Sequence, residues 1–313
     1  MSARWNRSTQ PSANTANHSK GGVLNERNNS HIGKNEKEHA PYCLLLPALA
    51  FVLVFKIYPL IYCFIQGFHY KGSWSLETFR ILFSNKSFWH SLWVTVKMNL
   101  VMTPLQIVLS FLMALLVNQA VRGVGTFRSL YYLPVTISMP VAAICWSLML
   151  SVNNGLANSL IGSWFGMEPQ GFFTDANQAL WCIVALSTWK GCGYWMMFYL
   201  AGLKGIDTSV YEAAKIDGAG ALQTLWNITI PLVKKTTLFV MVADTSINIL
   251  LFAPAQLITS GGPSDSTNVL MYEAYKQAFK YGSYEKGAAT TCVLVVLILI
   301  IVFFQFKLTN QED

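Results

Sequence analysis

The chain carries repeated apolar runs of about twenty residues, and this feature restricts its fold more than any other. A helix rises about 1.5 Å per residue, so each run is long enough to cross the ~30 Å hydrocarbon layer of a bilayer. Backbone N–H and C=O groups in lipid must be bonded within the segment, which makes each run a helix. Only 12% of the residues are charged, about half of the usual share. The sequence therefore predicts an all-α integral membrane protein.

Six of these runs are predicted to be membrane spans. Their ranges are 42–67, 91–117, 127–150, 179–203, 236–258 and 287–306. Residues 1–41 contain no apolar core of a signal peptide and are rich in Asn, Ser, Lys and Arg, so we expect a disordered cytoplasmic arm. The transmembrane domain then covers residues 42–306, and residues 307–313 form a short cytoplasmic tail.

The distribution of basic residues predicts the orientation of the spans. The net charge of +7 invites a nucleic-acid interpretation, but the Lys and Arg residues gather in alternate loops. With the N-terminus inside, the inner segments hold thirteen of the 22 basic residues and the outer loops hold six. Cytoplasmic loops of membrane proteins carry this excess. We therefore expect both termini, and the loop formed by residues 204–235, to lie in the cytoplasm.

Prolines occur in or beside several of the predicted spans. They are Pro47, Pro59, Pro104, Pro134, Pro140 and Pro254. A break in a membrane helix is tolerated where neighbouring helices or water satisfy the freed carbonyl groups. Two interpretations stay open for each proline, a kink that serves the opening of a path and a simple packing irregularity.

The loop 204–235, called the coupling segment below, contains a short amphipathic stretch between two strongly apolar runs. Ser209 and Glu212 have the spacing of a capping box, and a helix of small residues follows. Gly218 and Gly220 offer places for that helix to end, since glycine accepts left-handed torsions. A second helical piece is expected over 222–230. So short a helix needs a surface to pack against; docking onto a partner and a mere connector remain alternatives.

This segment resembles the EAA-x3-G-x9-I-x-(L/I)-P loop of ABC-importer permeases. The matching residues are Glu212, Ala213, Ala214, Gly218, Ile228 and Pro231. The stretches FRSLYYLP (127–134), TWKGCGYW (188–195), LAGLKGID (200–207) and TSGGPSDST (259–267) make the chain similar to the carbohydrate-uptake permeases of the maltose and glycerol-phosphate type. The resemblance runs from about residue 42 to the C-terminus. It implies the type I ABC-importer permease fold, with six membrane helices and a cytoplasmic coupling helix.

The resemblance also implies partners. In that family the EAA loop docks into a cleft of a separate ATPase subunit, which assigns a docking surface to Glu212, Ala213, Ala214, Asp217 and Gly218. The expected assembly contains a second homologous permease, two ATPase subunits and an extracytoplasmic solute-binding protein, near which the turn 261–264 would lie. The chain has no G-x4-G-K-[ST] sequence, so it has no P-loop for ATP phosphates. We expect no catalytic activity and no cofactor of its own, with ATP and magnesium bound by the partners.

Ionisable residues inside membrane spans are costly and usually face a cavity or a partner. Lys190 lies midway along the fourth span, Asp244 lies in the fifth, and Asn248 follows Asp244 by one helical turn. Matching the family's motifs carries substrate contacts onto six positions. They are Ser187, Lys190, Gly191, Asp244, Asn248 and Leu251. Lys190, Asp244 and Leu251 depart from the maltose pattern, which leaves the identity of the substrate open.

Three interpretations of Lys190 follow from its chemistry. It can form a structural ion pair with Asp244, it can extend toward the membrane interface, or it can attract an anionic group of a substrate. Four aromatic residues could stack on sugar faces or simply pack: Trp146, Trp189, Tyr194 and Trp195. All six cysteines lie in apolar runs, and neither His69 nor His90 has metal-ligand spacing. No metal site is predicted.

The sequence thus predicts a permease subunit of an ATP-driven importer in a bacterial cytoplasmic membrane, moving a sugar, oligosaccharide or sugar derivative. The alternative from another class is a secondary transporter that uses Asp244 and Lys190 as an ion or proton relay. Such transporters usually contain internal repeats, and none is detected. A membrane-embedded enzyme would need clustered His, Asp or Ser side chains at one depth, which the spans do not offer.

Overall fold

The computed structural model describes residues 45–119 and 123–310. The predicted arm 1–41 and the last three residues lie outside the described part. The chain divides into two compact units, one ending at Ile61 and one beginning at Tyr62. Over the described residues of the first unit the chain is helical from Leu45 onward. The strands β1 and β2 form one short antiparallel hairpin in the second unit, with His69 opposite Trp74; the rest of its regular structure in the described ranges is helical. The predicted all-α class is confirmed.

The elements have the following bounds. In chain order they are η1 (Leu53–Ile57), α2 (Tyr58–Gly67), β1 (His69–Tyr70), β2 (Ser73–Trp74), α3 (Glu77–Ser84), α4 (Lys86–Val117), α5 (Val124–Thr136), α6 (Met139–Met149), α7 (Leu156–Phe165), η2 (Phe172–Thr174), α8 (Ala179–Lys204), α9 (Thr208–Ile216), α10 (Ala221–Thr224), η3 (Leu225–Thr229), α11 (Ile230–Leu232), α12 (Lys234–Ile249), η4 (Ala255–Thr259), α13 (Leu270–Tyr275), η5 (Lys276–Lys280) and α14 (Tyr284–Asn310).

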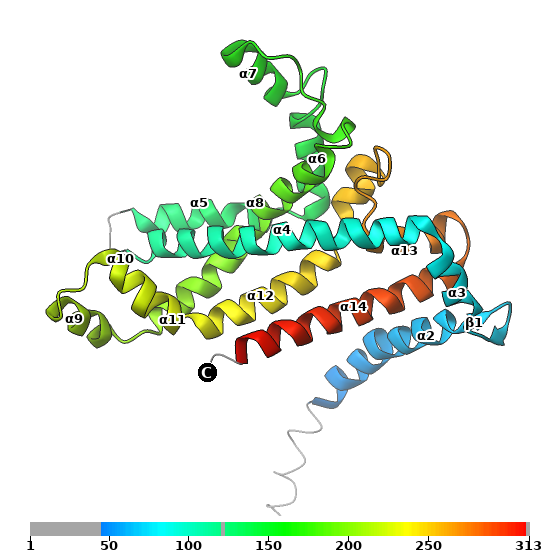
Figure 1. Ribbon diagram of the computed structural model, residues 1–313, viewed down its shortest axis with the longest axis horizontal. Coiled ribbons are helices and arrows are strands. Elements are labelled where there is room, and N and C mark those ends of the chain that lie inside the picture. Colours follow the sequence, from blue (N-terminus) through cyan, green and yellow to red (C-terminus); the bar gives the residue numbers. More distant parts are fainter. Residues whose placement is uncertain (1–44, 120–122, 311–313) are drawn as a thin grey trace, which may run out of the picture. The chain divides into compact units, whose positions relative to one another are not determined.

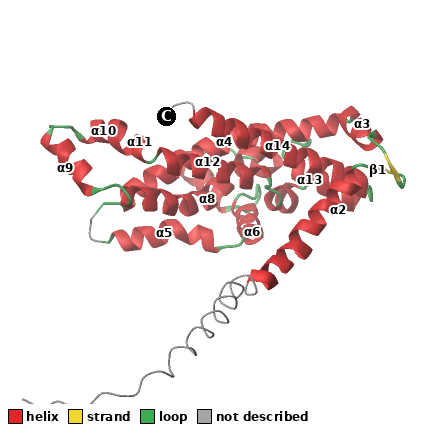
Figure 2. Ribbon diagram, turned by 90° about the horizontal axis from the view of Figure 1, so that it is seen from below, coloured by secondary structure: helices red, strands yellow, loops and turns green. Residues whose placement is uncertain are grey.

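Helices α4, α8, α12 and α14 form the bundle of the second unit and lie side by side in both views (Figure 1 and Figure 2). Helix α4 packs against both α8 and α12, and α12 also packs against α14. The coupling segment, with α9 and α10, projects from one end of this bundle, whereas α13 lies at the other end (Figure 1). The bundle therefore separates two polar ends by the length of its helices.

Within residues 45–119 and 123–310, three helices are long and apolar enough to cross a membrane: Leu45–Gly67, Lys86–Val117 and Tyr284–Lys307. Two bent helix pairs also pass as broken spans, which raises the number to five. Helix α8 coincides with the predicted span 179–203, and its 26 residues are enough to cross. It is less apolar than the other spans because it contains Lys190 and several polar residues. The structure is that of a multi-pass membrane protein.

The predicted third span 127–150 is not one continuous helix. The chain forms α5 and then α6, which are bent by 96° at the intervening break. Ile137 and Ser138 have extended backbone torsions. Pro140 lacks an N–H, and its ring would clash with the carbonyl group four residues earlier, so a continuous helix cannot form here. The expectation of one continuous helix was wrong at this point, although the pair α5 and α6 still passes as one broken span.

The predicted fifth span 236–258 also ends earlier than expected. Helix α12 stops at Ile249, and the chain resumes as the separate turn η4. Pro254 explains the break, because its ring would clash with the carbonyl group of Leu250 in a continued helix. Pro104, by contrast, lies inside the unbroken helix α4. Proline position alone therefore did not determine which spans break.

The interior of the bundle contains a stripe of polar side chains along α4. Its members repeat every three or four residues and are all buried: Ser91, Thr95, Asn99, Thr103, Gln106 and Ser110. Their partners come from other helices as well as from α4; Asn99 donates to the carbonyl group of Thr245 at 3.2 Å. The lipid-facing side of α4 is apolar, with Leu100 73% exposed. This stripe places hydrogen-bonding side chains between α4 and the helices packed against it, and Gln106 carries it to the central cavity.

Candidate functional site: a central polar cavity and a projecting coupling segment

A cavity of ≈ 300 Å³ lies between α4, α8, α12 and the link from α5 to α6. Its lining residues are Gln106, Val135, Met139, Ser187, Lys190, Gly191, Tyr194, Trp195, Asp244, Ile247, Asn248 and Leu251. All six residues predicted to contact substrate belong to this lining. The structure therefore brings them together; their contact with a substrate stays a prediction.

Helix periodicity explains how two helices supply most of the lining. On α8 the lining residues include Ser187, Lys190, Gly191 and Tyr194, spaced as i, i+3, i+4 and i+7. The same spacing starts at Asp244 on α12 and runs to the position of Leu251, just beyond the end of the helix. Residues three and four apart lie on one helix face. Each helix thus turns one polar face toward the cavity.

Asp244 is held by hydrogen bonds to its two carboxylate oxygens. The indole Nε1 of Trp195 donates to Oδ1 at 2.6 Å, and the Asn248 amide donates to Oδ2 at 2.8 Å. The residue is only 1% exposed. A buried carboxylate is tolerated when its oxygens accept hydrogen bonds in this way. Trp195 therefore acts as a polar partner of Asp244 as well as a packing residue.

Gln106 joins the two cavity-lining helices and was not identified from the sequence. Its Oε1 accepts a hydrogen bond from Asn248 at 2.8 Å, and its Nε2 donates to the carbonyl group of Ser187 at 2.9 Å. Gly191 makes this approach possible, because a Cβ at that position would collide with the Gln106 amide. The polar repeat along α4 was the signal that could have found Gln106.

Lys190 forms no salt bridge with Asp244, although both line the cavity. Its Nζ donates to the carbonyl group of Val135 at 3.4 Å, and its side chain is half-buried. The ion-pair interpretation of Lys190 is therefore wrong for this structure. Asp244 instead uses neutral donors, because Asn248 lies one turn further along α12 and Trp195 lies on α8, which packs against α12.

The four aromatic candidates divide into two pairs. Tyr194 and Trp195 line the cavity. Trp146 and Trp189 pack against each other, with ring centroids 5.8 Å apart, and are not part of its lining. Stacking on a sugar ring within this cavity thus remains a prediction for Tyr194 and Trp195 only.

The coupling segment starts with α9, whose N-terminal cap differs from the expected one. Asp207, rather than Ser209, caps the helix, and its carboxylate accepts a hydrogen bond from the Ser209 amide at 2.9 Å. This backbone hydrogen bond lowers the pKa of Asp207 below its ordinary value. An ionised Asp also suits the positive end of the helix dipole. The predicted capping box of Ser209 and Glu212 was therefore wrong.

The end of α9 agrees with the expectation for Gly218. Its φ is +77°, a left-handed torsion. The Gly218 amide bonds to the carbonyl group of Lys215 at 3.1 Å, and the Ala219 amide bonds to that of Ala214 at 2.9 Å. This pair of bonds is a Schellman motif. The left-handed torsion, and not a lack of space, therefore favours glycine at position 218, because a Cβ there would meet nothing within 4 Å.

The predicted docking residues of α9 do not all face outward. Glu212, Ala213, Asp217 and Gly218 are exposed, whereas Ala214 is buried. Three large apolar side chains beside them are exposed and were not singled out from the sequence: Ile216 at 86%, Leu222 at 71% and Trp226 at 62%. Apolar residues in an otherwise polar loop were the available signal. Exposed apolar area of this kind marks an interaction surface.

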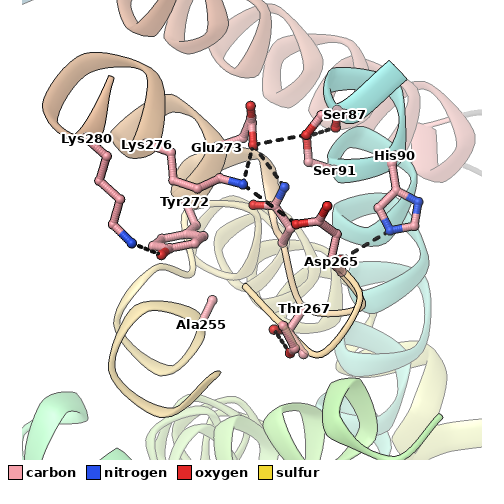
Figure 3. A network of polar contacts seen from close by, with 12 residues as sticks. Ser87, His90, Ser91, Ala255, Asp265, Thr267, Tyr272, Glu273, Lys276 and Lys280 are labelled. Carbon is pink, nitrogen blue, oxygen red and sulfur yellow. Dashed lines mark hydrogen bonds and ion pairs between the residues drawn. The ribbon is translucent and has the colours of Figure 1, made fainter. Parts of the chain in front are cut away.

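A second polar cluster, called the outer cluster, lies at the opposite end of the bundle and centres on Glu273 (Figure 3). Glu273 is 1% exposed and forms a salt bridge of 2.9 Å with Lys276. Its oxygens also accept hydrogen bonds from Asn268 at 2.9 Å and from Gln277 at 2.8 Å. Burial raises the pKa of Glu273, but these hydrogen bonds and Lys276 outweigh it, so the pKa is lowered overall.

The outer cluster also anchors the turn that contains Gly261 and Pro263. Lys276 reaches Asp265 at 3.8 Å, and the His90 ring donates from Nε2 to the Asp265 carbonyl group at 3.1 Å (Figure 3). These contacts fix the loop between η4 and α13 against α4. Among residues 45–119 and 123–310, no group of three or more His, Cys, Asp or Glu side chains could hold a metal ion.

Membrane-spanning helices and a cavity lined by Lys190, Asp244 and Asn248 fit the class of transport permeases. The chain matches, over residues 41–309, the family described as binding-protein-dependent transport system inner membrane component, and it belongs to that family. The resemblance drawn from the coupling segment is confirmed.

Individual relatives agree with this assignment. The chain is 32% identical over 281 residues to the lactose transport system permease protein LacF of Rhizobium radiobacter, covering 87% of this chain and 94% of the relative. It is 29% identical over 281 residues to the sn-glycerol-3-phosphate transport system permease protein UgpA of Agrobacterium fabrum, covering 87% and 95%. The fold resembles a chain of the crystal structure of a bacterial alginate ABC transporter in complex with alginate pentasaccharide-bound periplasmic protein, with a TM-score of 0.80, 22% identity and coverage of 88% and 96%.

Proposed function

We propose that this chain is the permease subunit of an ATP-driven importer that moves a sugar, oligosaccharide or sugar derivative across a bacterial cytoplasmic membrane. The position of the coupling segment between the two cavity-lining helices carries this proposal. Helix α8 ends at Lys204, α9 follows directly, and the chain returns through α10 and α11 to α12. A movement of α9 is therefore transmitted to both walls of the cavity.

The distances along the helices make this linkage direct. Lys190 lies fourteen residues before the end of α8, which is about 21 Å at the rise of a helix. Asp244 lies ten residues after the start of α12, or about 15 Å. A rigid helix carries a displacement of its end over such lengths. Directional transport then requires that the cavity bind substrate with different affinity in its two states.

The remaining parts of the machine come from partners. The exposed apolar side chains around α9 suit docking into an ATPase subunit, two of which would drive the transporter. A second permease of similar fold would complete the path, and a solute-binding protein would deliver substrate on the outer side. The alginate transporter structure was solved with such a periplasmic protein, and the relatives LacF and UgpA are named for lactose and glycerol phosphate transport. Both termini and the coupling segment would face the cytoplasm, and this chain itself would catalyse no reaction.

Charge reversal at the coupling segment tests this proposal. Glu212→Lys should abolish co-purification of the ATPase and reduce ATP-dependent sugar uptake by proteoliposomes at least 10-fold, because Glu212 is exposed on α9. Glu168→Lys is a matched control, since Glu168 is also exposed but lies in the loop before α8, on the outer side in the proposed orientation. An equal effect of both changes, or a purified chain that never binds an ATPase, would reject the proposal.

A further inference from the structure

We propose that Lys190 and Ser187 form a receiving site for an oxyanion, so that the transported sugar derivative carries a carboxylate or a phosphate group. This inference rests on the proposed function, because it names the chemical class of the substrate. It concerns the α8 wall of the central cavity. The pair lies one helical turn apart on the face of α8 that lines the cavity.

The charge of Lys190 is not balanced within the described part of the chain. Its one hydrogen bond there goes to a backbone carbonyl group, that of Val135, at 3.4 Å. A half-buried ammonium group inside a membrane-spanning helix is costly unless an anion or several oxygens compensate it. The cavity places open volume next to this ammonium group. A ligand oxyanion would supply the missing compensation.

The hydroxyl group of Ser187 is a second, independent indication. Ser187 is 5% exposed, and its Oγ has no hydrogen-bond partner among residues 45–119 and 123–310. Serine hydroxyls in helices usually bond to a carbonyl group of the preceding turn, as Ser246 does to Val242 at 2.8 Å. The hydroxyl of Ser187 remains available as a donor to a ligand that reaches the α8 wall. Ser187 and Lys190 together thus offer a neutral and a charged donor at i and i+3.

Asp244 does not oppose this assignment, although it is an acid in the same cavity. Its two oxygens already accept hydrogen bonds from Trp195 and Asn248, and it is 1% exposed. Asp244 is fixed on α12, whereas Ser187 and Lys190, the proposed donors to the oxyanion, belong to α8. The cavity therefore has one basic and one acidic wall. An anionic group would bind at Lys190, and sugar hydroxyl groups would donate to the remaining lone pairs of Asp244.

Two other lysines of the described chain have the interaction partners expected of a lysine with a structural role. Lys276 forms its salt bridge with Glu273, and Lys97, also in a membrane-spanning helix, lies over the Trp181 ring at 5.2 Å. Within the described ranges, Lys190 forms neither a salt bridge with a carboxylate nor a cation–π contact with an aromatic ring. A compact ammonium group that forms charge-assisted hydrogen bonds is well suited to carboxylates and phosphates.

The test uses the complete transporter, with its partner permease, ATPases and binding protein, reconstituted in proteoliposomes. The probes are monosaccharides and disaccharides, each supplied as the neutral sugar, the uronate and the phosphate ester, which separates a carboxylate substrate from a phosphate substrate. ATP-dependent uptake is compared for wild type, Lys190→Met, Lys190→Arg and Ser187→Ala. Lys97→Met is the matched control, because it removes a lysine from a membrane helix outside the cavity.

We expect wild type to take up an anionic sugar and Lys190→Met to lower that uptake about 10- to 100-fold, the loss expected for a charged hydrogen bond. Lys190→Arg should retain most of the uptake, and Ser187→Ala should lower it by less than Lys190→Met. Lys97→Met should stay within about twofold of wild type, since Lys97 is exposed and does not line the cavity. Thermal melting of each variant complex excludes misfolding as the cause.

Two results would overturn the inference while leaving the proposed function intact. One is uptake of neutral sugars only by wild type; the other is an equal loss for neutral and anionic sugars in Lys190→Met. In both cases uptake would still be abolished by Glu212→Lys. If no sugar is taken up in an ATP-dependent manner, the inference and the proposed function fail together.

Discussion

Asp244 in the central cavity and Glu273 in the outer cluster are two buried carboxylates whose negative charges are compensated by different partners. Each is 1% exposed and accepts hydrogen bonds from side-chain amides. Glu273 has a lysine salt bridge at 2.9 Å. Asp244 has an indole donor instead, while Lys190, in the same cavity, remains apart. We call the outer cluster the closed cluster, because a lysine balances the charge of Glu273. We call the group of Asp244, Lys190 and Ser187 in the central cavity the open cluster, because Asp244 and Lys190 form no salt bridge.

The difference predicts a structural role for the outer cluster and supports the proposed binding role of the central cavity. A closed cluster has its donors and acceptors matched within the chain, so it fixes a loop and offers little to a ligand. An open cluster keeps a charge and a hydroxyl group available next to a cavity. Residue type and burial are alike in the two places, and only the pairing distinguishes them.

Helix geometry accounts for the two pairings. Glu273 and Lys276 are three residues apart in one continuous helical stretch, so their side chains meet on the same face. Lys190 and Asp244 lie on different helices, and their distance depends on how α8 and α12 pack. The Asn248 and Trp195 side chains reach Asp244 in that packing.

The largest expected effect is the loss of the lysine in the closed cluster. Lys276→Met should lower the free energy of unfolding by about 3 kcal/mol, because it leaves the buried carboxylate of Glu273 without its cation. Unfolding of the purified protein in detergent, followed by circular dichroism, measures the change. The double variant Lys276→Met with Glu273→Gln should recover part of the loss. A single variant as stable as wild type would contradict the closed-cluster interpretation.

A smaller effect is expected for the carboxylate of the open cluster. Asp244→Asn should lower the free energy of unfolding by about 1–3 kcal/mol, because an amide NH₂ group would face the donors Trp195 or Asn248. The same unfolding measurement tests it. The conservative shape of the change excludes a cavity as the cause. Stability above that of wild type would show that Asp244 is not held by these two donors.

Removing the lysine of the open cluster should hardly change stability. Lys190→Met should alter the free energy of unfolding by less than about 1 kcal/mol, since no salt bridge is lost and a methionine occupies a similar space. Transport of an anionic sugar should nevertheless fall. A loss of stability as large as that of Lys276→Met would mean that Lys190 has a structural partner, and the comparison between the clusters would fail.

The weakest expected signal is the pH dependence of the closed cluster. The pKa of Glu273 is lowered from its ordinary value of 4.5, so its ionised form stabilises the fold above that value. This stabilisation is lost as the pH falls through the lowered pKa of the folded state. The difference in melting temperature between wild type and Glu273→Gln should be constant above about pH 5 and should shrink below pH 4.5. A difference that grows on acidification would contradict the lowered pKa.

The sequence alone predicted the features that depend on residues close to one another along the chain. Apolar length located the helices, and Gly218 located the end of α9, because a left-handed torsion is a local property. The family motif then carried Ser187, Lys190 and Asp244 to positions that share one cavity in the structure. The N-cap was missed because Asp207 and Ser209 are both good capping residues, and the bond to the Ser209 amide decided between them.

Contacts between helices could not be predicted in this way. Gln106 bridges Asn248 and Ser187 only because α4, α8 and α12 pack with their polar faces together. The 96° bend between α5 and α6 likewise depends on how the chain continues on either side of the break. Pro104 lies inside the continuous helix α4 whereas Pro140 lies in the first turn of α6, and the tertiary contacts determine whether the helix continues at a proline.

The sequence by itself determined that this protein lies in a membrane, where most of its long helices lie, and where the short helix α9 ends. These properties follow from hydrophobic length and local hydrogen bonding, which the surrounding fold does not change. The tertiary structure alone decided that Lys190 forms no salt bridge with Asp244 and that Gln106 bridges Asn248 and Ser187. That outcome depends on distances between side chains of different helices, and those distances exist only after the helices have packed.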